Sequence, residues 1–164
     1  MEEKIKIAVI GLGYVGLPLA VEFGKKFITY AYDISKEKIN IFKKFKDPFT
    51  EISKKEFLSS KKLIFTSDIK NVSKANFIII AVPTPIYKNK KPNLKFLEKS
   101  SKSVASYMKK NSIVVYESTV YPGTTEEICI PILEKYSKLT WKEGFNVGYS
   151  PERINPGDKN KTLS

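Results

Sequence analysis

Six short apolar runs recur along the chain, and helix-like stretches lie between them. The runs are Ile5–Ile10, Ile28–Asp33, Leu63–Thr66, Phe77–Val82, Ile113–Glu117 and Asn146–Tyr149. Their apolar residues are continuous rather than alternating, which is typical of parallel strands that are buried on both faces. This pattern limits the fold more than any other feature, because it predicts a sheet that is mainly parallel.

The helix-like stretches complete the expected architecture. They are Val15–Lys26, Lys36–Phe45, Lys54–Ser59, Leu94–Lys110 and Thr124–Lys138. Ser35 and Asn93 are candidate N-caps, and Thr124 is a weaker one. The alternation of strand and helix predicts the α/β class: a Rossmann-type doubly wound, mainly parallel sheet with helices on both faces. Right-handed crossovers then bring the carboxyl ends of the strands, where ligands bind, to one edge of the sheet.

Length and composition narrow the class of protein. A chain of 164 residues with 41% hydrophobic and 28% charged residues fits one globular domain or one lobe of a larger protein. The N-terminus shows no signal segment, and no apolar run is long enough to span a membrane. Cys129 is the single cysteine and histidine is absent, which excludes an intramolecular disulfide and serine–histidine chemistry and argues against a cysteine-based metal site. We expect a cytoplasmic protein with no metal and no membrane partner, and with Cys129 buried and inert in a helix.

A net charge of +12 raises the question of whether the chain binds nucleic acid. The lysines are spread from Lys4 to Lys161, however, and Arg153 is the only arginine. Proteins that read DNA usually place arginine on base edges. We therefore expect no nucleic-acid partner, and a basic field that favours anionic cofactors and sugar nucleotides.

The glycines Gly11, Gly13 and Gly16 form a G-x-G-x-x-G pattern between the first predicted strand and the first predicted helix. In this pattern the first glycine permits a tight turn, the second lets the backbone approach a pyrophosphate, and the third lets the helix pack close to the strand. The N–H groups at the helix start and the positive end of its dipole bind the phosphates. The pattern predicts a dinucleotide site, and a turn that binds nothing is the alternative.

Asp33 strengthens the dinucleotide interpretation. It ends the second predicted strand, about 20 residues beyond the glycine turn, where an acidic side chain accepts hydrogen bonds from the adenosine ribose. A carboxylate there repels a 2′-phosphate, so NAD is preferred over NADP. Lys38, one helical turn into the next helix, contacts the adenosine side of the cofactor or is one more solvated lysine.

Two further loops follow predicted strands at the same edge. In the first, Pro83 and Pro85 stiffen the chain while Thr84 offers a hydroxyl toward a cofactor, although a rigid turn is the simpler interpretation of these residues alone. In the second, the hydroxyls of Ser118 and Thr119 position a water or a sugar hydroxyl, or else they cap local backbone.

The last such loop contains Glu152 and Arg153 between Pro151 and Pro156. The planar guanidinium of Arg153 suits an anionic or hydroxyl-rich substrate. Glu152 is a candidate general base or water ligand. A surface salt bridge between the two residues is the alternative.

Taken together, five motifs resemble the NAD-binding half of the UDP-glucose/GDP-mannose 6-dehydrogenases. They occur in the family's order as "GLGYVGLPLA", Asp33, "VPTP", "ESTVYPGTTEE" and "YSPERINPGDK". The resemblance covers residues 1–164 as one NAD-binding domain, and the last motif is most similar to the UDP-N-acetylhexosamine branch, which includes enzymes that supply uronic acids for bacterial capsule or O-antigen. It implies oxidation of the C6 alcohol of a UDP-N-acetylhexosamine or UDP-hexose to a carboxylate with two NAD molecules. It also implies a homodimer for the full-length enzyme.

The resemblance also implies the site residues. The candidate cofactor contacts are Gly11, Gly13, Tyr14, Val15, Gly16, Asp33, Lys38, Pro83, Thr84, Ser118 and Thr119. Among them, Val15, Asp33, Lys38, Thr84 and Thr119 are the contacts that the resemblance implies. Thr119 and Glu152 are the implied catalytic residues near the reacting carbon. The implied substrate contacts are Glu152, Arg153, Ile154 and Asn155.

The chain departs from the family pattern in one respect. Family enzymes continue into a long central helix and a second domain that carries a catalytic lysine, an asparagine and the cysteine that forms a thioester, and these are absent here. We therefore expect a fragment that binds NAD without oxidising a sugar nucleotide alone. The alternatives are a stand-alone dinucleotide-binding or regulatory module and a lobe of a related hydroxyacid dehydrogenase. The residues do not distinguish glucose, N-acetylglucosamine and N-acetylgalactosamine substrates.

Overall fold

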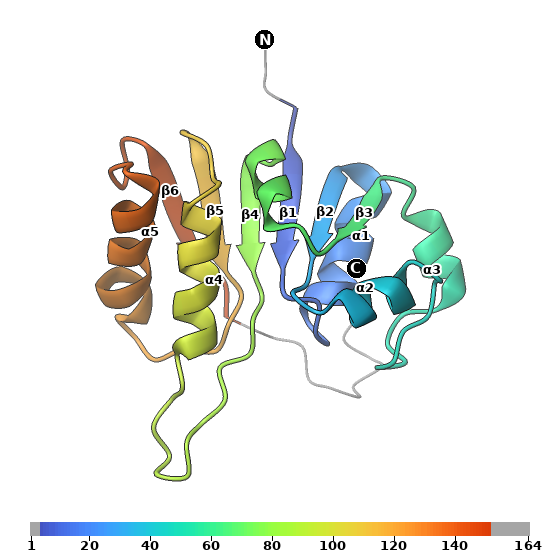
Figure 1. The fold of residues 1–164 in the computed structure, drawn as a ribbon, viewed down its shortest axis with the longest axis horizontal. Coiled ribbons are helices and arrows are strands. Elements are labelled where there is room, and N and C mark those ends of the chain that lie inside the picture. The colour runs from blue at the N-terminus through green and yellow to red at the C-terminus, as the bar shows by residue number, and fades with distance from the viewer. Residues whose placement is uncertain (1–3, 152–164) are drawn as a thin grey trace.

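The computed structural model describes residues 4–151, and in this part of the chain six strands form one sheet whose neighbouring strands are all parallel. The strands are β1 (Lys6–Ile10), β2 (Ile28–Tyr32), β3 (Leu63–Thr66), β4 (Phe77–Ile80), β5 (Ser112–Tyr116) and β6 (Phe145–Tyr149). They lie in the order β3-β2-β1-β4-β5-β6 (Figure 1). This is the strand order of the doubly wound Rossmann fold, so the predicted fold class is confirmed.

Helices connect the strands, and all five predicted helices are present, the last of them in two parts. They are α1 (Gly16–Lys26), α2 (Lys36–Phe42), α3 (Lys54–Ser59), α4 (Lys95–Ala105) and α5 (Ile130–Ser137), together with a 3₁₀-helix η1 (Ile69–Lys74) and a π-helix η2 (Thr125–Cys129). The prediction did not include η1. Helix α2 ends earlier than predicted, and Phe45, the expected last residue, adopts a left-handed φ of 56° that no α-helix continues through.

The core has two halves, one on each face of the sheet. In β1, Ile7 and Val9 pack in a cluster with residues of α1, α2 and α3, whereas Ala8 and Ile10 pack in a cluster with residues of η1, α4 and α5. Successive side chains of a strand point to opposite faces, so a strand covered on both sides needs apolar residues at every position. This is why the runs in the sequence are continuous.

Of the three predicted N-caps, only Ser35 is confirmed in full. The Ser35 hydroxyl accepts the Lys38 N–H at 3.2 Å, as predicted. Asn93 Oδ1 accepts the Lys95 N–H at 3.1 Å, although Leu94 occupies the N-cap position of α4. The prediction that Thr124 caps its helix is wrong: its hydroxyl instead donates to the Tyr121 carbonyl at 2.7 Å.

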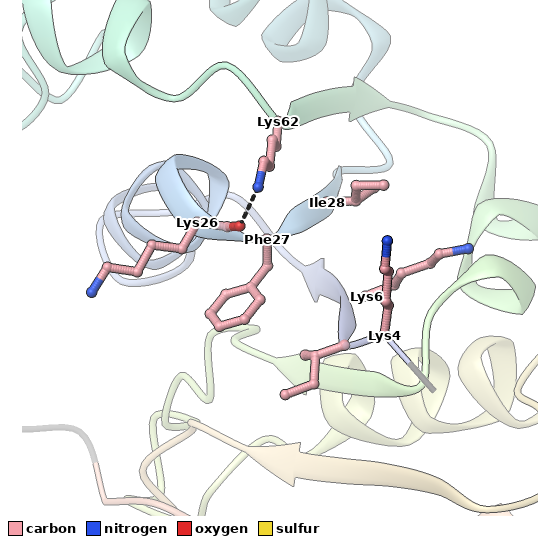
Figure 2. Close-up of a pocket in the computed structure, with 7 residues that line it drawn as sticks. Lys4, Lys6, Lys26, Phe27, Ile28 and Lys62 are labelled. Atoms are coloured by element: carbon pink, nitrogen blue, oxygen red, sulfur yellow. Dashed lines mark hydrogen bonds between the residues drawn. The ribbon is translucent and has the colours of Figure 1, made fainter. Parts of the chain in front are cut away.

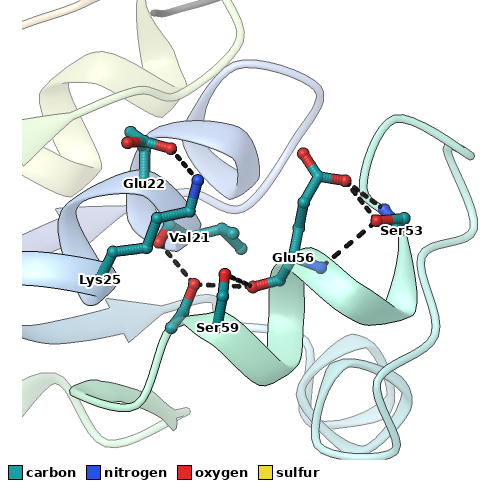
Figure 3. A network of polar contacts seen from close by, with 7 residues as sticks. Val21, Glu22, Lys25, Ser53, Glu56 and Ser59 are labelled. Carbon is teal, nitrogen blue, oxygen red and sulfur yellow. Dashed lines mark hydrogen bonds and ion pairs between the residues drawn. The ribbon is translucent and has the colours of Figure 1, made fainter.

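Helix α3 carries a capping box that the prediction missed. The Glu56 N–H donates to the Ser53 hydroxyl at 3.3 Å, and the Ser53 N–H donates to Glu56 Oε2 at 2.8 Å (Figure 3). The hydrogen bond from the Ser53 side chain is the main cause that lowers the pKa of Glu56. The Ser60 hydroxyl donates to the Val21 carbonyl at 2.7 Å, which ties the end of α3 to α1. The S-x-x-E spacing at Ser53 was the signal available in the sequence.

The last helical stretch widens into a π-helix before Pro131. A proline inside a helix has no N–H to donate, and its ring clashes with the carbonyl four residues earlier, which here is that of Glu127. The wide turn η2 spans that carbonyl and α5 continues beyond it. The predicted helix is therefore continuous in direction but changes its hydrogen-bond pattern. Cys129 ends the π-helix and is buried, as predicted.

Candidate functional site

The glycine turn begins where β1 ends, at the carboxyl edge of the sheet. The Gly11 N–H donates to the Tyr32 carbonyl at 2.9 Å, which continues the pairing of β1 with β2 into the turn. Gly11 has a φ of +93°, and a Cβ at this position would lie 2.8 Å from the Ala81 carbonyl oxygen. A residue with a side chain would therefore be strained here and would also clash with the backbone after β4.

The other two glycines differ in what surrounds them. A Cβ on Gly16 would lie 1.8 Å from the Gly11 carbonyl oxygen, so the start of α1 packs directly on the turn. A Cβ on Gly13 would meet nothing within 4 Å. The protein's own packing thus requires Gly11 and Gly16 but not Gly13. The open space at Gly13 is where a pyrophosphate would approach the backbone, so the turn fits a dinucleotide.

The start of α1 is suited to an anion. Val15 occupies its N-cap without a side-chain hydrogen bond, and its first turn carries no acidic residue. The first N–H groups of a helix have no partner within the helix, and the dipole makes this end positive. Tyr14, in the same turn, is 42% exposed. The Leu17 N–H donates to the Gly13 carbonyl at 3.0 Å, and neither a capping side chain nor an acidic residue competes with a phosphate at this helix start.

Asp33 joins the end of β2 to the glycine turn. Its Oδ2 accepts the Leu12 N–H at 3.0 Å and its Oδ1 accepts the Ser35 N–H at 2.9 Å, while the side chain is largely buried. An ionised carboxylate has about four acceptor positions, so capacity remains for ribose hydroxyls. Lys38 lies beside it, with Nζ 3.7 Å from Asp33 Oδ2 and 5.7 Å from the centroid of the Phe49 ring.

The loops after β4 and β5 are hydrogen-bonded to each other. The Thr84 hydroxyl donates to the Thr119 carbonyl at 2.6 Å, and the Ser118 hydroxyl donates to the Val82 carbonyl at 2.7 Å. Ser118 is 2% exposed, whereas the side chain of Thr119 is exposed. The structure thus brings Thr84, Ser118 and Thr119 together, and the two hydroxyls bond across loops instead of capping local backbone.

A buried polar cluster that the sequence interpretation missed lies beneath the second loop. Tyr116, the last residue of β5, has its hydroxyl 2.8 Å from the Ser101 hydroxyl of α4. Burial raises the pKa of the Tyr116 phenol well above its ordinary value. Burial also raises the pKa of the Cys129 thiol to about 11, even though hydrogen bonds to Tyr116 and Ser101 lower it. A thiol protonated at neutral pH is a poor nucleophile, in line with the expected inert cysteine.

The predicted substrate residues Glu152, Arg153, Ile154 and Asn155 lie outside the described residues. Just before them, the Ser150 N–H donates to the Tyr116 carbonyl at 3.0 Å. Strand β6 therefore ends beside the end of β5, at the same edge as the glycine turn and the two loops.

A basic hollow lies at the opposite edge, beside the amino ends of β1 and β2. It has a volume of about 990 Å³ and is lined by Lys4, Ile5, Lys6, Lys26, Phe27, Ile28 and Lys62 (Figure 2). Lys62 Nζ donates to the Lys26 carbonyl at 2.7 Å, and the Lys26 side chain points away from Lys62. Among the described residues no carboxylate lines this hollow.

The described residues offer neither a cluster of metal ligands nor a membrane-spanning helix. Within residues 4–151, no group of three or more histidine, cysteine, aspartate or glutamate side chains is placed to hold a metal ion. In the same range no helix combines the length and the apolar character needed to cross a membrane.

The sequence matches known proteins along nearly its whole length. Residues 5–164 match the NAD binding domain of the UDP-glucose/GDP-mannose dehydrogenase family. The chain is 50% identical over 162 residues to UDP-N-acetyl-D-glucosamine 6-dehydrogenase of Pseudomonas aeruginosa, a match that covers 99% of this chain and 38% of that protein. It is 53% identical over 157 residues to Protein CapL of Staphylococcus aureus, covering 96% of this chain and 37% of that protein.

The fold matches solved structures of the same kind. A ternary complex of GDP-mannose dehydrogenase from Pseudomonas aeruginosa aligns with a TM-score of 0.87 at 28% identity, over 93% of this chain and 37% of that one. The chain thus spans less than two fifths of the length of these relatives. The matched part is the one that contains the glycine turn and the loops at the carboxyl edge.

Proposed function

Because the chain belongs to the UDP-glucose/GDP-mannose dehydrogenase family through its NAD-binding domain, we propose that it binds NAD along the carboxyl edge of its sheet. One observation carries this proposal. Contacts inside the chain account for Gly11 and Gly16, whereas Gly13 leaves open space that a bound pyrophosphate would use.

In the proposed binding mode, different parts of the carboxyl edge bind different parts of NAD. The backbone N–H groups at the start of α1 bind the pyrophosphate, helped by the helix dipole. Asp33 accepts hydrogen bonds from the adenosine ribose with the lone pairs that Leu12 and Ser35 leave free, and its charge repels the 2′-phosphate of NADP. The other residues that we propose for the cofactor site are Tyr14, Val15, Lys38, Pro83, Thr84, Ser118 and Thr119.

We propose further that the whole enzyme oxidises the C6 alcohol of a UDP-N-acetylhexosamine to the uronate. The names of the curated relatives support this substrate class over a UDP-hexose. Two hydrides leave C6 for two NAD molecules in turn, and water supplies the second carboxylate oxygen. Thr119 and Glu152 lie near the reacting carbon in this proposal, and Arg153, with Ile154 and Asn155, holds the substrate.

The biological setting completes the proposal. NAD and UDP-sugars are used in the cytoplasm, so we expect the enzyme there. We expect the whole enzyme to be a homodimer, and its product to serve a surface polysaccharide such as capsule or O-antigen. The relative named CapL supports the capsule assignment.

A pair of measurements tests the function. The melting temperature of the 164-residue chain is expected to rise with NAD and not with NADP, because a ligand that binds the folded state stabilises it. The same chain is expected to form no NADH from UDP-N-acetyl-D-glucosamine. In a full-length relative, replacing the arginine equivalent to Arg153 by alanine weakens sugar-nucleotide binding if the enzyme proposal holds. An unchanged affinity would favour a stand-alone dinucleotide-binding module.

A further inference from the structure

The loops after β4 and β5 are joined by two hydrogen bonds that run in opposite directions. The Thr84 hydroxyl donates to the carbonyl of Thr119, and the Ser118 hydroxyl donates to the carbonyl of Val82, at 2.6 Å and 2.7 Å. Each loop therefore supplies one side-chain donor and one backbone acceptor. The bonded residues are 35 and 36 positions apart in the sequence. The two bonds therefore join loops that are not neighbours along the chain.

These bonds act on the backbone around Thr119. Thr84 holds the carbonyl of Thr119 itself, and Ser118 is the residue directly before it. Upstream, the Glu117 N–H donates to the Ile80 carbonyl at 2.9 Å, which extends the pairing of β4 and β5 up to the loop. Three successive residues are thus bound to the β4 side: Glu117 and Thr119 through their backbone, and Ser118 through its side chain.

The same bonds limit what Ser118 and Thr84 can do for a cofactor. A hydroxyl has a single proton to donate. The Ser118 hydroxyl donates its proton to the Val82 carbonyl. Because Ser118 is 2% exposed, neither water nor a ligand easily replaces that hydrogen bond. The proton of Thr84 is likewise committed to Thr119. Thr119, in contrast, is exposed, and no hydrogen bond within the described residues takes up its hydroxyl.

We propose that Thr84 and Ser118 are positioning residues that hold Thr119 against the cofactor, rather than hydrogen-bond donors to the cofactor. This inference rests on the proposed function, since Thr119 is the proposed contact at the nicotinamide end. The two loops then form one unit, and the loss of either hydroxyl displaces Thr119.

A double-mutant cycle on NAD affinity tests this proposal. Thr84→Val removes the hydroxyl and keeps the shape, and it is expected to weaken NAD binding roughly 5- to 10-fold, whereas Thr84→Ser retains the donor and the affinity. With Thr119→Val already present, the further change Thr84→Val is expected to cost less than about twofold, because the group that it positions is gone. Equal losses in both backgrounds would show that Thr84 contacts NAD directly and would overturn the proposal.

Amide hydrogen exchange without NAD separates this inference from the proposed function. Ser118→Ala and Thr84→Val are each expected to speed exchange of the flanking amides of Glu117 and Thr124, whose N–H groups donate to the carbonyls of Ile80 and Tyr121, and Thr84→Ser is expected to leave it unchanged. Exchange unaffected by both variants would mean that the bonds do not hold the loop, and the proposal would fail even if the chain binds NAD. Faster exchange in a chain that does not bind NAD would keep the loop coupling and reject the proposed function.

Discussion

The two edges of the sheet hold their polar groups in different ways. At the carboxyl edge, Asp33, Thr84 and Ser118 each bond to the backbone of another segment, and two of the three are buried. At the amino edge, four lysines line a hollow, and the hydrogen bond that orders one of them, from Lys62 to the Lys26 carbonyl, is exposed. The amino edge thus has several lysines with little to hold them in place, whereas the polar side chains of the carboxyl edge are held by hydrogen bonds.

This difference shows that a specific anion site in a lysine-rich chain needs fixed donors as well as positive charge. A net charge of +12 attracts anions to much of the surface, but exposed ammonium groups on flexible stems have no preferred arrangement. Backbone N–H groups at a glycine turn are fixed before the ligand arrives. We therefore expect changes at the carboxyl edge to alter folding or NAD binding strongly and changes at the amino edge to alter both weakly.

The largest effect is expected from Gly16→Ala. The added Cβ would lie 1.8 Å from the Gly11 carbonyl oxygen, a backbone atom that cannot move without opening the turn. We expect a loss of about 3 kcal/mol in the free energy of unfolding, measured by urea denaturation.

Gly13→Ala is the matched control for Gly16→Ala. Its Cβ meets nothing within 4 Å, so the stability should change by less than about 0.5 kcal/mol while NAD affinity falls at least about tenfold. Equal stabilities of the two alanine variants would contradict the packing described for the turn.

Alkaline pH is expected to weaken the structure under the carboxyl edge. The pKa of Cys129 rises from 9.0 to about 11 in the folded chain, so the folded state binds this proton more tightly than the unfolded state does. The resulting stability is complete below pH 9 and is lost as the pH rises to 11, at up to about 1.4 kcal/mol per pH unit. Denaturation at pH 8, 9, 10 and 11 measures this slope.

Cys129→Ala supplies the control for the alkaline series. The variant should lose less stability between pH 9 and 11, although Tyr116, whose pKa is also raised, contributes a decline of the same sign. A decline equally steep in the variant would show that the thiol does not titrate as its burial implies.

Asp33→Asn is expected to have an intermediate effect. An amide has one acceptor oxygen, so one of the N–H groups of Leu12 and Ser35 loses its partner, at a cost of about 2 kcal/mol. The preference for NAD over NADP should also narrow, because the repelling charge is gone. Paired calorimetric titrations measure this ratio.

The exposed Glu37 of α2 offers a control with the same change of charge. Glu37→Gln should leave stability and cofactor preference nearly unchanged. A comparable loss in both variants would indicate that net charge, rather than the position of Asp33, sets the preference.

The strands and the glycine turn could be predicted because their causes are local. Continuous apolar runs follow from burial on both faces, and the turn glycines have a recognisable spacing. Helix ends were less predictable: α4 stops at Ala105 rather than at Lys110. The six residues of the 3₁₀-helix η1 are too few to show an apolar periodicity in the sequence.

The connections within the site could not be predicted from local pattern. The hydrogen bonds of Thr84 and Ser118 depend on β4 and β5 being neighbours in the sheet, and the alternative that Ser118 caps nearby backbone was equally consistent with the sequence. The contact of Tyr116 with Ser101 likewise depends on how α4 packs over β5. Residue types could therefore be identified in advance, but not the groups to which they bond.

The smallest effect is expected at the amino edge. Lys62→Met keeps the apolar stem and removes the exposed hydrogen bond to the Lys26 carbonyl. Stability should change by less than about 0.5 kcal/mol and NAD affinity by less than about twofold. A marked loss of NAD affinity would show that the amino edge takes part in NAD binding. It would contradict the stated difference between the two edges.

The most direct measurement is a calorimetric titration of the 164-residue chain and its Gly13→Ala variant with NAD, with NADP as the control. We expect saturable binding of NAD by the parent chain, clearly weaker binding of NADP, and a loss of NAD affinity in the variant at unchanged melting temperature. Equal affinity of the parent and the variant for NAD, or no binding of NAD by the parent chain, would contradict the claim that the glycine turn is a working cofactor site.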